Sequence, residues 1–286
     1  ALEAVADAHA KGYIEAILIG DVEKIKAIGG EAGLDLSPFE LVPSDGDGDA
    51  AFKATDIVAA GDADILMKGY VHTDDLLRAI LRREGGLRTG RLMSHVFVMA
   101  PPSHGRFFLI SDGAMNIAPT LHQKVQILLN AVYVGLALGI EKPKVACLSA
   151  VETVNANIPG TVDADSLRKM SEDGVFKSPC AVWGPLALDN AVSEEAARTK
   201  GISGPVAGRA DVLIVPNIES GNMLFKSMVY FGNSPLAGIV VGAKVPIVLT
   251  SRADSPESKL LSIALSTYVA YESCRTGLEP ELAPEV

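Results

Sequence analysis

Short runs of apolar residues alternate along this chain with longer stretches whose apolar positions recur every three or four residues. The clearest such stretch predicts a helix from about Pro119 to Leu138. Its buried face would comprise Val125, Leu128, Leu129, Val132 and Leu136. Helices are also expected over residues 1–12, 22–33, 72–86 and 256–275. The apolar runs predict strands within 13–20, 63–71, 94–99, 107–114, 144–150, 210–217, 236–242 and 245–251.

Most of these apolar runs are continuous and do not alternate with polar residues. Continuous apolar strands separated by helices are typical of a parallel sheet that is covered on both faces. The pattern therefore predicts an α/β fold. In such folds ligands bind at the carboxyl ends of the strands. The polar or glycine residues found there form the pool of site candidates: Gly20-Asp21, Lys68-Gly69, Ser111-Asp112-Gly113, Ser149, Asn217 and Ser251-Arg252.

Ser251 and Arg252 follow the last predicted strand and precede the last predicted helix. Ser255 has the features of a helix N-cap, and Pro256 suits the first helical position. Backbone N–H groups and the positive end of a helix favour an anion in such a loop, and a guanidinium matches phosphate or carboxylate. The alternative is a surface arginine that pairs with Asp254 or Glu257.

Three further positions are weaker candidates. Arg78 lies on the predicted helix 72–86, which Thr73 would cap, and it is either a surface arginine or a ligand. Asn217 is either a helix cap or a site residue. The pair Gly221-Asn222 leads into a helix and either forms a turn or lets a ligand approach the backbone closely.

Composition narrows the class of protein. The chain has 286 residues, of which 48% are hydrophobic and 21% charged, which is typical of a globular protein of one large or two ordinary domains. The net charge of −10 argues against a nucleic-acid partner, which would require a basic surface. A few arginines can still bind a small anion on an acidic protein.

The sequence lacks the motifs that indicate several common kinds of site. The three cysteines are far apart, so we expect a reducing cytoplasm rather than disulfides. No Cys/His spacing indicates a metal site, and no apolar stretch is long enough to predict a membrane span. The acidic segment 44–50 departs from a calcium loop at Ala50 and at Asp56, and is expected to be a solvated turn. The motifs GxGxxG, GxxxxGK[ST] and GxSxG are absent.

Seven segments, taken in order, resemble the phosphate acetyltransferase/phosphate butyryltransferase family. They are LMKG, HTDDLLRAIL, LISDGAMNIAPTLHQKVQILLNAV, KVACLSAVETVN, GPLALDNAVS, ADVLIVPNIESGNMLFKSMVYF and VPIVLTSRADSPESK. The resemblance covers nearly the whole chain from Gly12. It is strongest to the branch that is often fused to an enoyl-CoA hydratase-like domain, so the chain is expected to be a fragment of a fusion protein or a trimmed sequence.

The resemblance implies a reversible reaction in which acyl-CoA and inorganic phosphate give acyl phosphate and CoA. Acetyl and butyryl groups both remain open. It implies a two-domain, three-layer α/β fold like that of isocitrate and isopropylmalate dehydrogenases. Domain I would comprise residues 1–90 and 239–286, domain II residues 91–238, and the site would lie in the cleft. A homodimer with no metal and no tightly bound cofactor is expected.

The resemblance also implies roles for individual residues. Arg252 would bind the phosphate, with Arg78 sharing its charge, and Ser251 would donate a hydrogen bond to the oxyanion of the tetrahedral intermediate. Asn217, Asn222 and Asp254 are possible cleft residues. The acetyl-specific branch has an aspartate seven residues after the serine, but this chain has Ser258 there, so the base for the CoA thiol is not assigned.

Two alternatives remain at the level of the sequence. Domains of this family also occur as acyl-CoA sensors without catalysis, although a sensor has no need of Ser251, Arg252 and Arg78. A metal-dependent decarboxylating dehydrogenase of the related fold would need an aspartate cluster and a dinucleotide site, and the sequence has no persuasive set of either.

Overall fold

The computed structural model describes residues 1–251 and 254–283, which separate into two compact units. Unit 1 comprises Ala1–Gly90 and Ala237–Tyr271. Unit 2 comprises Arg91–Leu236 and the C-terminal residues from Glu272 on. The predicted domain boundaries and the predicted cleft stay predictions.

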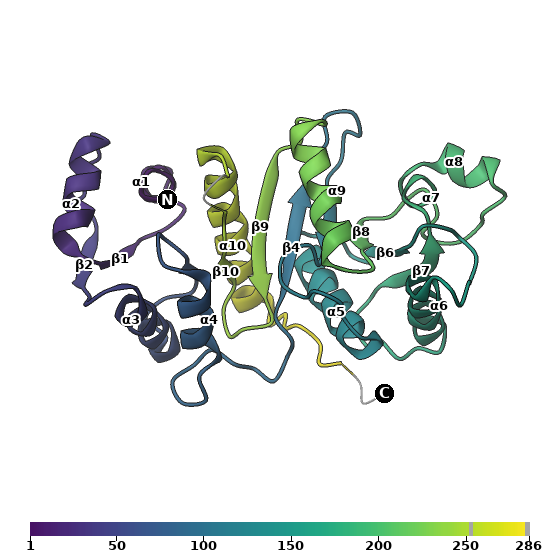
Figure 1. Ribbon diagram of the computed structural model, residues 1–286, viewed down its shortest axis with the longest axis horizontal. Helices are drawn as coiled ribbons and strands as arrows, with labels where there is room; N and C mark the ends of the chain where they lie inside the picture. Colours follow the sequence, from purple (N-terminus) through teal and green to yellow (C-terminus); the bar gives the residue numbers. More distant parts are fainter. Residues whose placement is uncertain (252–253, 284–286) are drawn as a thin grey trace. The chain divides into compact units, whose positions relative to one another are not determined.

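Unit 1 combines two small groups of strands with helices. Its strands are β1 (Ile17–Gly20), β2 (Glu40–Pro43), β3 (Leu66–Met67), β9 (Leu236–Val241) and β10 (Ile247–Val248). Its helices are α1 (Leu2–Ala10), α2 (Val22–Glu31), α3 (Asp47–Ala60), α4 (Thr73–Leu81) and α10 (Pro256–Thr276). β1 pairs with β2 in parallel, and β10 pairs in parallel with β3 and antiparallel with β9 (Figure 1).

For two helices of unit 1, the sequence predicted which residue caps the N-terminus; one prediction is confirmed and the other is wrong. Ser255 caps α10 as predicted, because its Oγ accepts a hydrogen bond from the Ser258 N–H at 3.0 Å, and Pro256 is the first helical residue. The cap predicted for α4 is wrong: the N-cap is His72, and Thr73 is already helical. α4 also ends at Leu81, earlier than predicted, because the Leu87 N–H turns back to the Ile80 carbonyl.

Unit 2 is built on a sheet with the strand order β4-β5-β8-β6-β7. These strands are β4 (Ser94–Met99), β5 (Phe108–Ser111), β6 (Lys144–Leu148), β7 (Ala181–Leu186) and β8 (Val212–Ile214). β4 and β5 are antiparallel, and the pairs from β5 to β7 are parallel. The helices are α5 (Leu121–Ala137), α6 (Pro159–Glu172), α7 (Leu188–Val192), α8 (Glu194–Thr199) and α9 (Ile218–Tyr230).

α5 is the central helix of unit 2 and packs against β4, β5 and β8 (Figure 1). A capping box of Thr120 and Gln123 fixes its start, and nearly all of its side chains are buried. Two of its buried polar side chains have partners: Asn130 donates from Nδ2 to the Leu92 carbonyl, although Asn130 Oδ1 accepts no hydrogen bond from the described residues, and Lys124 pairs with Asp163 of α6 at 2.7 Å. Such pairing is what makes polar groups tolerable in a core.

The α/β fold with mostly parallel strands is confirmed. The acidic segment 44–50 is not only a turn, because Asp47 begins α3 and Asp49 pairs with Lys53 at 2.7 Å. Among the described residues, no group of His, Cys, Asp and Glu side chains is arranged to hold a metal ion.

Candidate functional site

The residues predicted for the site belong to both units. Arg78, Ser251 and Asp254 lie in unit 1, whereas Asn217 and Asn222 lie in unit 2. Arg252 lies outside the described residues. The contacts of these residues within each unit define the geometry that follows.

Two hydrogen bonds join described residues between β10 and the first turn of α10. The Ser251 N–H donates to Asp254 Oδ2 at 2.7 Å, and Lys259 Nζ donates to the Asp254 carbonyl at 2.5 Å. Ser251 itself is exposed. Asp254 is thus an acceptor for the Ser251 backbone, and Ser251 precedes the positive end of α10 in the chain.

Ser258, which stands where the acetyl-specific branch has an aspartate, belongs to the first turn of α10. Its N–H donates to Ser255 Oγ, and its carbonyl accepts a hydrogen bond from Ser262 Oγ at 2.7 Å. The same Ser262 Oγ accepts from the Gly238 N–H, which ties α10 to β9. Ser258 therefore has a structural role in the helix start and supplies no carboxylate.

Two cations of unit 1 differ in their surroundings. Arg78 is exposed and pairs with Asp75 one turn earlier at 2.8 Å, a surface pair that costs little to break. Lys68 is only 8% exposed, and its ammonium donates to the carbonyls of Gly69 and Val71. The Lys68 N–H also donates to the Val248 carbonyl, so the backbone of Lys68 lies beside the strand that leads to Ser251.

In unit 2, Asp112 organises the segment after β5. Its carboxylate is 3% exposed and accepts hydrogen bonds from the N–H groups of Ala114, Met115 and Asn116, at 2.8 to 3.3 Å. It also accepts from Asn116 Nδ2 at 2.6 Å and from the His95 N–H at 3.2 Å. A single buried carboxylate thus fixes the conformation of residues 112–116.

The first turns of α9 pack directly against this segment. A Cβ at Gly221 would lie 2.8 Å from Gly113 Cα, so two glycines allow the backbones to touch. Asn222 Nδ2 donates to the Gly113 carbonyl at 3.2 Å, and the Ile218 N–H donates to the Ile117 carbonyl at 3.0 Å. The close approach predicted for Gly221 is therefore made by the protein's own backbone.

Asn217 is the N-cap of α9. Its Oδ1 accepts from the Ser220 N–H at 2.9 Å, and Ser220 Oγ donates back to it at 2.8 Å. The cap interpretation of Asn217 is thus the one that the contacts explain, and Asn222 serves as a link to the segment after β5. The sequence included Asp112 only as one of several polar strand ends and did not indicate its role.

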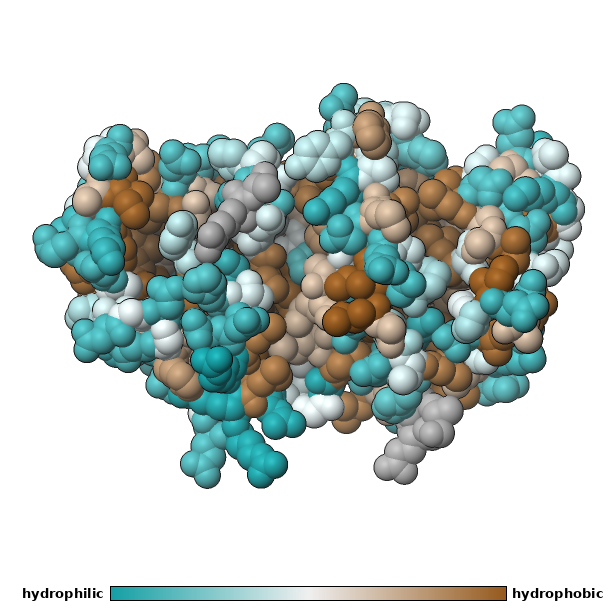
Figure 2. Space-filling model, in the orientation of Figure 1, coloured by the Kyte–Doolittle hydropathy of each residue, from teal (hydrophilic) through white to brown (hydrophobic). Residues whose placement is uncertain are grey.

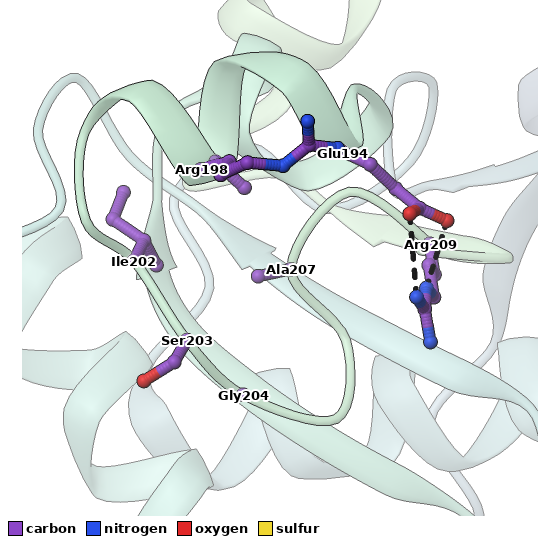
Figure 3. Close-up of a pocket in the computed structure, with 8 residues that line it drawn as sticks. Glu194, Arg198, Ile202, Ser203, Gly204, Ala207 and Arg209 are labelled. Carbon is purple, nitrogen blue, oxygen red and sulfur yellow. Dashed lines mark hydrogen bonds and ion pairs between the residues drawn. The ribbon is translucent and has the colours of Figure 1, made fainter.

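One hollow among the described residues lies elsewhere in unit 2. It is open, has a volume of about 230 Å³, and lies between α8 and residues 202–209 (Figure 3). Glu194 and Arg209 on its wall pair at 2.8 Å, so their charges offset each other. None of the described site residues lines this hollow, and we do not assign the site to it.

Burial makes two cysteines unsuitable as nucleophiles. Burial raises the pKa of the Cys147 thiol to about 12 and that of Cys180 to about 11. Both thiols are therefore protonated near neutral pH, and a protonated thiol is a poor nucleophile.

These features are those of an α/β protein with polar side chains at the carboxyl ends of parallel strands. The side chains just described include no metal cluster and no cysteine nucleophile. Residues 45–267 match the model of a protein family that is described as "Phosphate acetyl/butaryl transferase". The chain belongs to this family, which confirms the resemblance seen in its motifs.

Individual relatives agree with this assignment. The chain is 49% identical to phosphate butyryltransferase of Clostridium acetobutylicum, over 94% of this chain and 89% of the relative. It is 46% identical to phosphate acetyltransferase of Rhizobium meliloti, over 92% and 83%. A branched-chain phosphotransacylase from Enterococcus faecalis V583 has a similar structure, with a TM-score of 0.79, 35% identity and coverage of 90% and 99%.

No helix among the described residues has the length and apolar character that crossing a bilayer requires.

Proposed function

We propose that this chain catalyses the reversible transfer of a short acyl group between CoA and inorganic phosphate. The observation that carries the proposal is the 49% identity to a phosphate butyryltransferase over 94% of the chain. The matched relatives are named as transferases, which favours catalysis over the acyl-CoA-sensing alternative. The acyl group is acetyl, butyryl or another short chain, because relatives of both names match comparably.

The proposed reaction is a direct displacement. A phosphate oxygen attacks the thioester carbonyl, the carbonyl oxygen becomes an oxyanion in a tetrahedral intermediate, and the C–S bond then breaks to give acyl phosphate and the CoA thiolate. Ser251 donates a hydrogen bond to the oxyanion. Most of the rate enhancement would come from holding phosphate beside the thioester and from stabilising this developing charge.

Positive charge near Ser251 is needed because phosphate is an anion. Arg252 is proposed as the main phosphate ligand, on the resemblance alone. Arg78 supports the proposal as a second cation, since its ion pair with Asp75 is exposed. Lys68, which is buried and pairs with β10 through its backbone, adds a further positive charge to this unit.

We propose that a group other than Asp254 protonates the leaving thiolate. The carboxylate of Asp254 accepts the Ser251 N–H and so has a structural task in the turn. Ser258 cannot replace the missing aspartate as a base. The CoA thiolate would accordingly take its proton from solvent or from a phosphate oxygen.

Catalysis is tested by mixing the protein with phosphate and either acetyl-CoA or butyryl-CoA, and by measuring free thiol. The wild type should release CoA only when phosphate is present. Arg252→Ala should lose about 100-fold or more of this activity. Arg209→Ala, which removes an arginine from the hollow beside α8, should keep it. Full activity in Arg252→Ala would overturn the assignment of the phosphate ligand.

The expectations of a homodimer, of a cytoplasmic location, and of no metal and no tightly bound cofactor rest on the resemblance and stay predictions.

A further inference from the structure

The segment that follows α10, residues 277–283, has no regular secondary structure, yet hydrogen bonds and an ion pair join it to unit 2. It leaves the helix at Gly277, whose φ of 69° lies in the left-handed region that favours glycine. Figure 1 shows this segment in yellow, between the end of α10 and the C-terminus. We call residues 277–283 the strap.

Glu281 and Gln126 make most of the contacts of the strap. The Glu281 carboxylate accepts hydrogen bonds from the N–H groups of Lys177 and Ser178, at 2.7 to 3.1 Å. The Glu281 carbonyl accepts from Gln126 Nε2 at 3.1 Å, and Gln126 Oε1 accepts from the Ala283 N–H at 3.2 Å. The strap thus joins α5, which carries Gln126, to the loop between α6 and β7.

The strap is held at the surface and buries little apolar area. Each of its residues is exposed or half-buried, and Leu282 is 58% exposed. A further contact is the ion pair of Glu279 with Arg91 at 3.5 Å. Figure 2 shows hydrophilic and hydrophobic residues interspersed in this region of the molecule. Segments with few buried apolar contacts open locally at a small cost in free energy.

One thiol lies near the strap. Cys180 is half-buried and follows Ser178, which binds Glu281, by two residues. Burial chiefly, and the Glu281 carboxylate next, raise the pKa of the Cys180 thiol to about 11. A carboxylate of the strap therefore acts on this cysteine through space.

We propose that the strap opens as one piece while the rest of unit 2 stays folded, and that the docked strap shields Cys180. Glu281 and Gln126 hold neighbouring points of the same short backbone, so the loss of either set of contacts should release the other. The strap is thus a conformational device that controls the accessibility of a half-buried cysteine. This role is separate from the acyl transfer proposed above and does not depend on it.

The experiment measures how fast iodoacetamide alkylates each cysteine of the folded protein at about pH 8, by peptide mass mapping. In this reaction the thiolate sulfur displaces iodide, and the thiol proton goes to solvent. Gln126→Ala should speed alkylation of Cys180 by about tenfold or more, because lost hydrogen bonds raise the population of the open strap. This variant keeps the Glu281 carboxylate, so the lost charge cannot be the cause.

The other cysteines and a matched variant are the controls. Cys147 is buried in β6 and should stay as slow as in the wild type if the opening is local. Cys274 is exposed and shows that the reagent is equally active in each sample. Gln123→Ala also changes a glutamine of α5, but its amide accepts from the Thr120 N–H. Its Cys180 should react at the wild-type rate.

Glu281→Ala removes both the contacts and the charge, so it should speed alkylation of Cys180 at least as much as Gln126→Ala does. An unchanged Cys180 rate in Gln126→Ala would overturn the proposal, even if Glu281→Ala were faster, because only the charge would then matter. An equal acceleration of Cys147 in Gln126→Ala would overturn it too, since the whole unit and not the strap would then be opening.

Discussion

Ser251 is the described side chain on which the proposed chemistry depends most directly. The Ser251 N–H donates to Asp254 Oδ2, and the Ser251→Ala change keeps this backbone hydrogen bond while it removes the hydroxyl. Loss of one oxyanion donor typically costs about 100- to 1,000-fold in kcat. We therefore expect Ser251→Ala to lower kcat by this amount, with little change in KM and in the unfolding midpoint.

Ser166→Ala is a suitable control for this variant, because the exposed Ser166 hydroxyl donates to the Val162 carbonyl within α6. Its kcat should match that of the wild type. A Ser251→Ala enzyme with unaltered kcat would remove Ser251 from the mechanism.

The three cysteines should differ sharply in reactivity. A thiol with a pKa of about 12 is ionised at pH 8 in only about one molecule in ten thousand, so Cys147 should resist alkylation in the folded protein. Cys274 is exposed and should react first. Peptide mass mapping after a short iodoacetamide treatment would check this order, and fast labelling of Cys147 in folded protein would contradict it. Because its pKa is raised, Cys147 should become more reactive only as the pH approaches that value.

At the scale of residues, sequence reasoning found positions more readily than roles. Asn217 and Ser255 could be recognised as caps because the cap and its partner are three residues apart. The role of Asp112 depends partly on the His95 N–H, which is 17 residues earlier, and on a segment that only the fold brings near. Contacts of this kind cannot be derived from local spacing.

At the scale of elements, local sequence pattern was enough to predict α5 but not α6. α5 was predicted because its apolar residues recur regularly over five turns. α6 was not predicted, since its buried residues are Thr161, Ala164 and Leu167 and most of its other residues are polar. β7 was also missed, because it contains Gly184 and Pro185, residues that usually indicate a turn. β3 and β10 proved shorter than their apolar runs.

The contact between α9 and the segment after β5 gives a sharp prediction. A Cβ at residue 221 would lie 2.8 Å from Gly113 Cα, which is backbone and cannot simply move aside. We expect Gly221→Ala to lower the free energy of unfolding by about 2 kcal/mol or more, as other overpacking changes do, and to lower activity as well. Urea unfolding followed by circular dichroism would measure the stability.

Gly30→Ala serves as the control for this change. Gly30 is also helical, in α2, but a Cβ there meets nothing within 4 Å. Since alanine favours a helix over glycine, this variant should gain about 0.5–1 kcal/mol. If both variants shifted stability equally, the tight contact between the two glycines would be refuted.

At the scale of the whole molecule, the resemblance predicts a homodimer of a strongly acidic chain. Size-exclusion chromatography with light scattering should give twice the chain mass of 29.9 kDa across a range of protein concentrations. Self-repulsion from a net charge of −10 per chain should make the dimer no weaker, and if anything tighter, at higher salt. A single species of 29.9 kDa at micromolar concentration would contradict the dimer.

The central claim is that the acyl group passes from CoA to phosphate and not to water. The most direct measurement follows CoA thiol and butyryl phosphate together, by a thiol assay and ³¹P NMR, after butyryl-CoA and phosphate are mixed with the protein. Our account predicts that the two products form in equal amounts and that adding CoA and butyryl phosphate reverses the reaction. Release of CoA with free butyrate and no butyryl phosphate would contradict it.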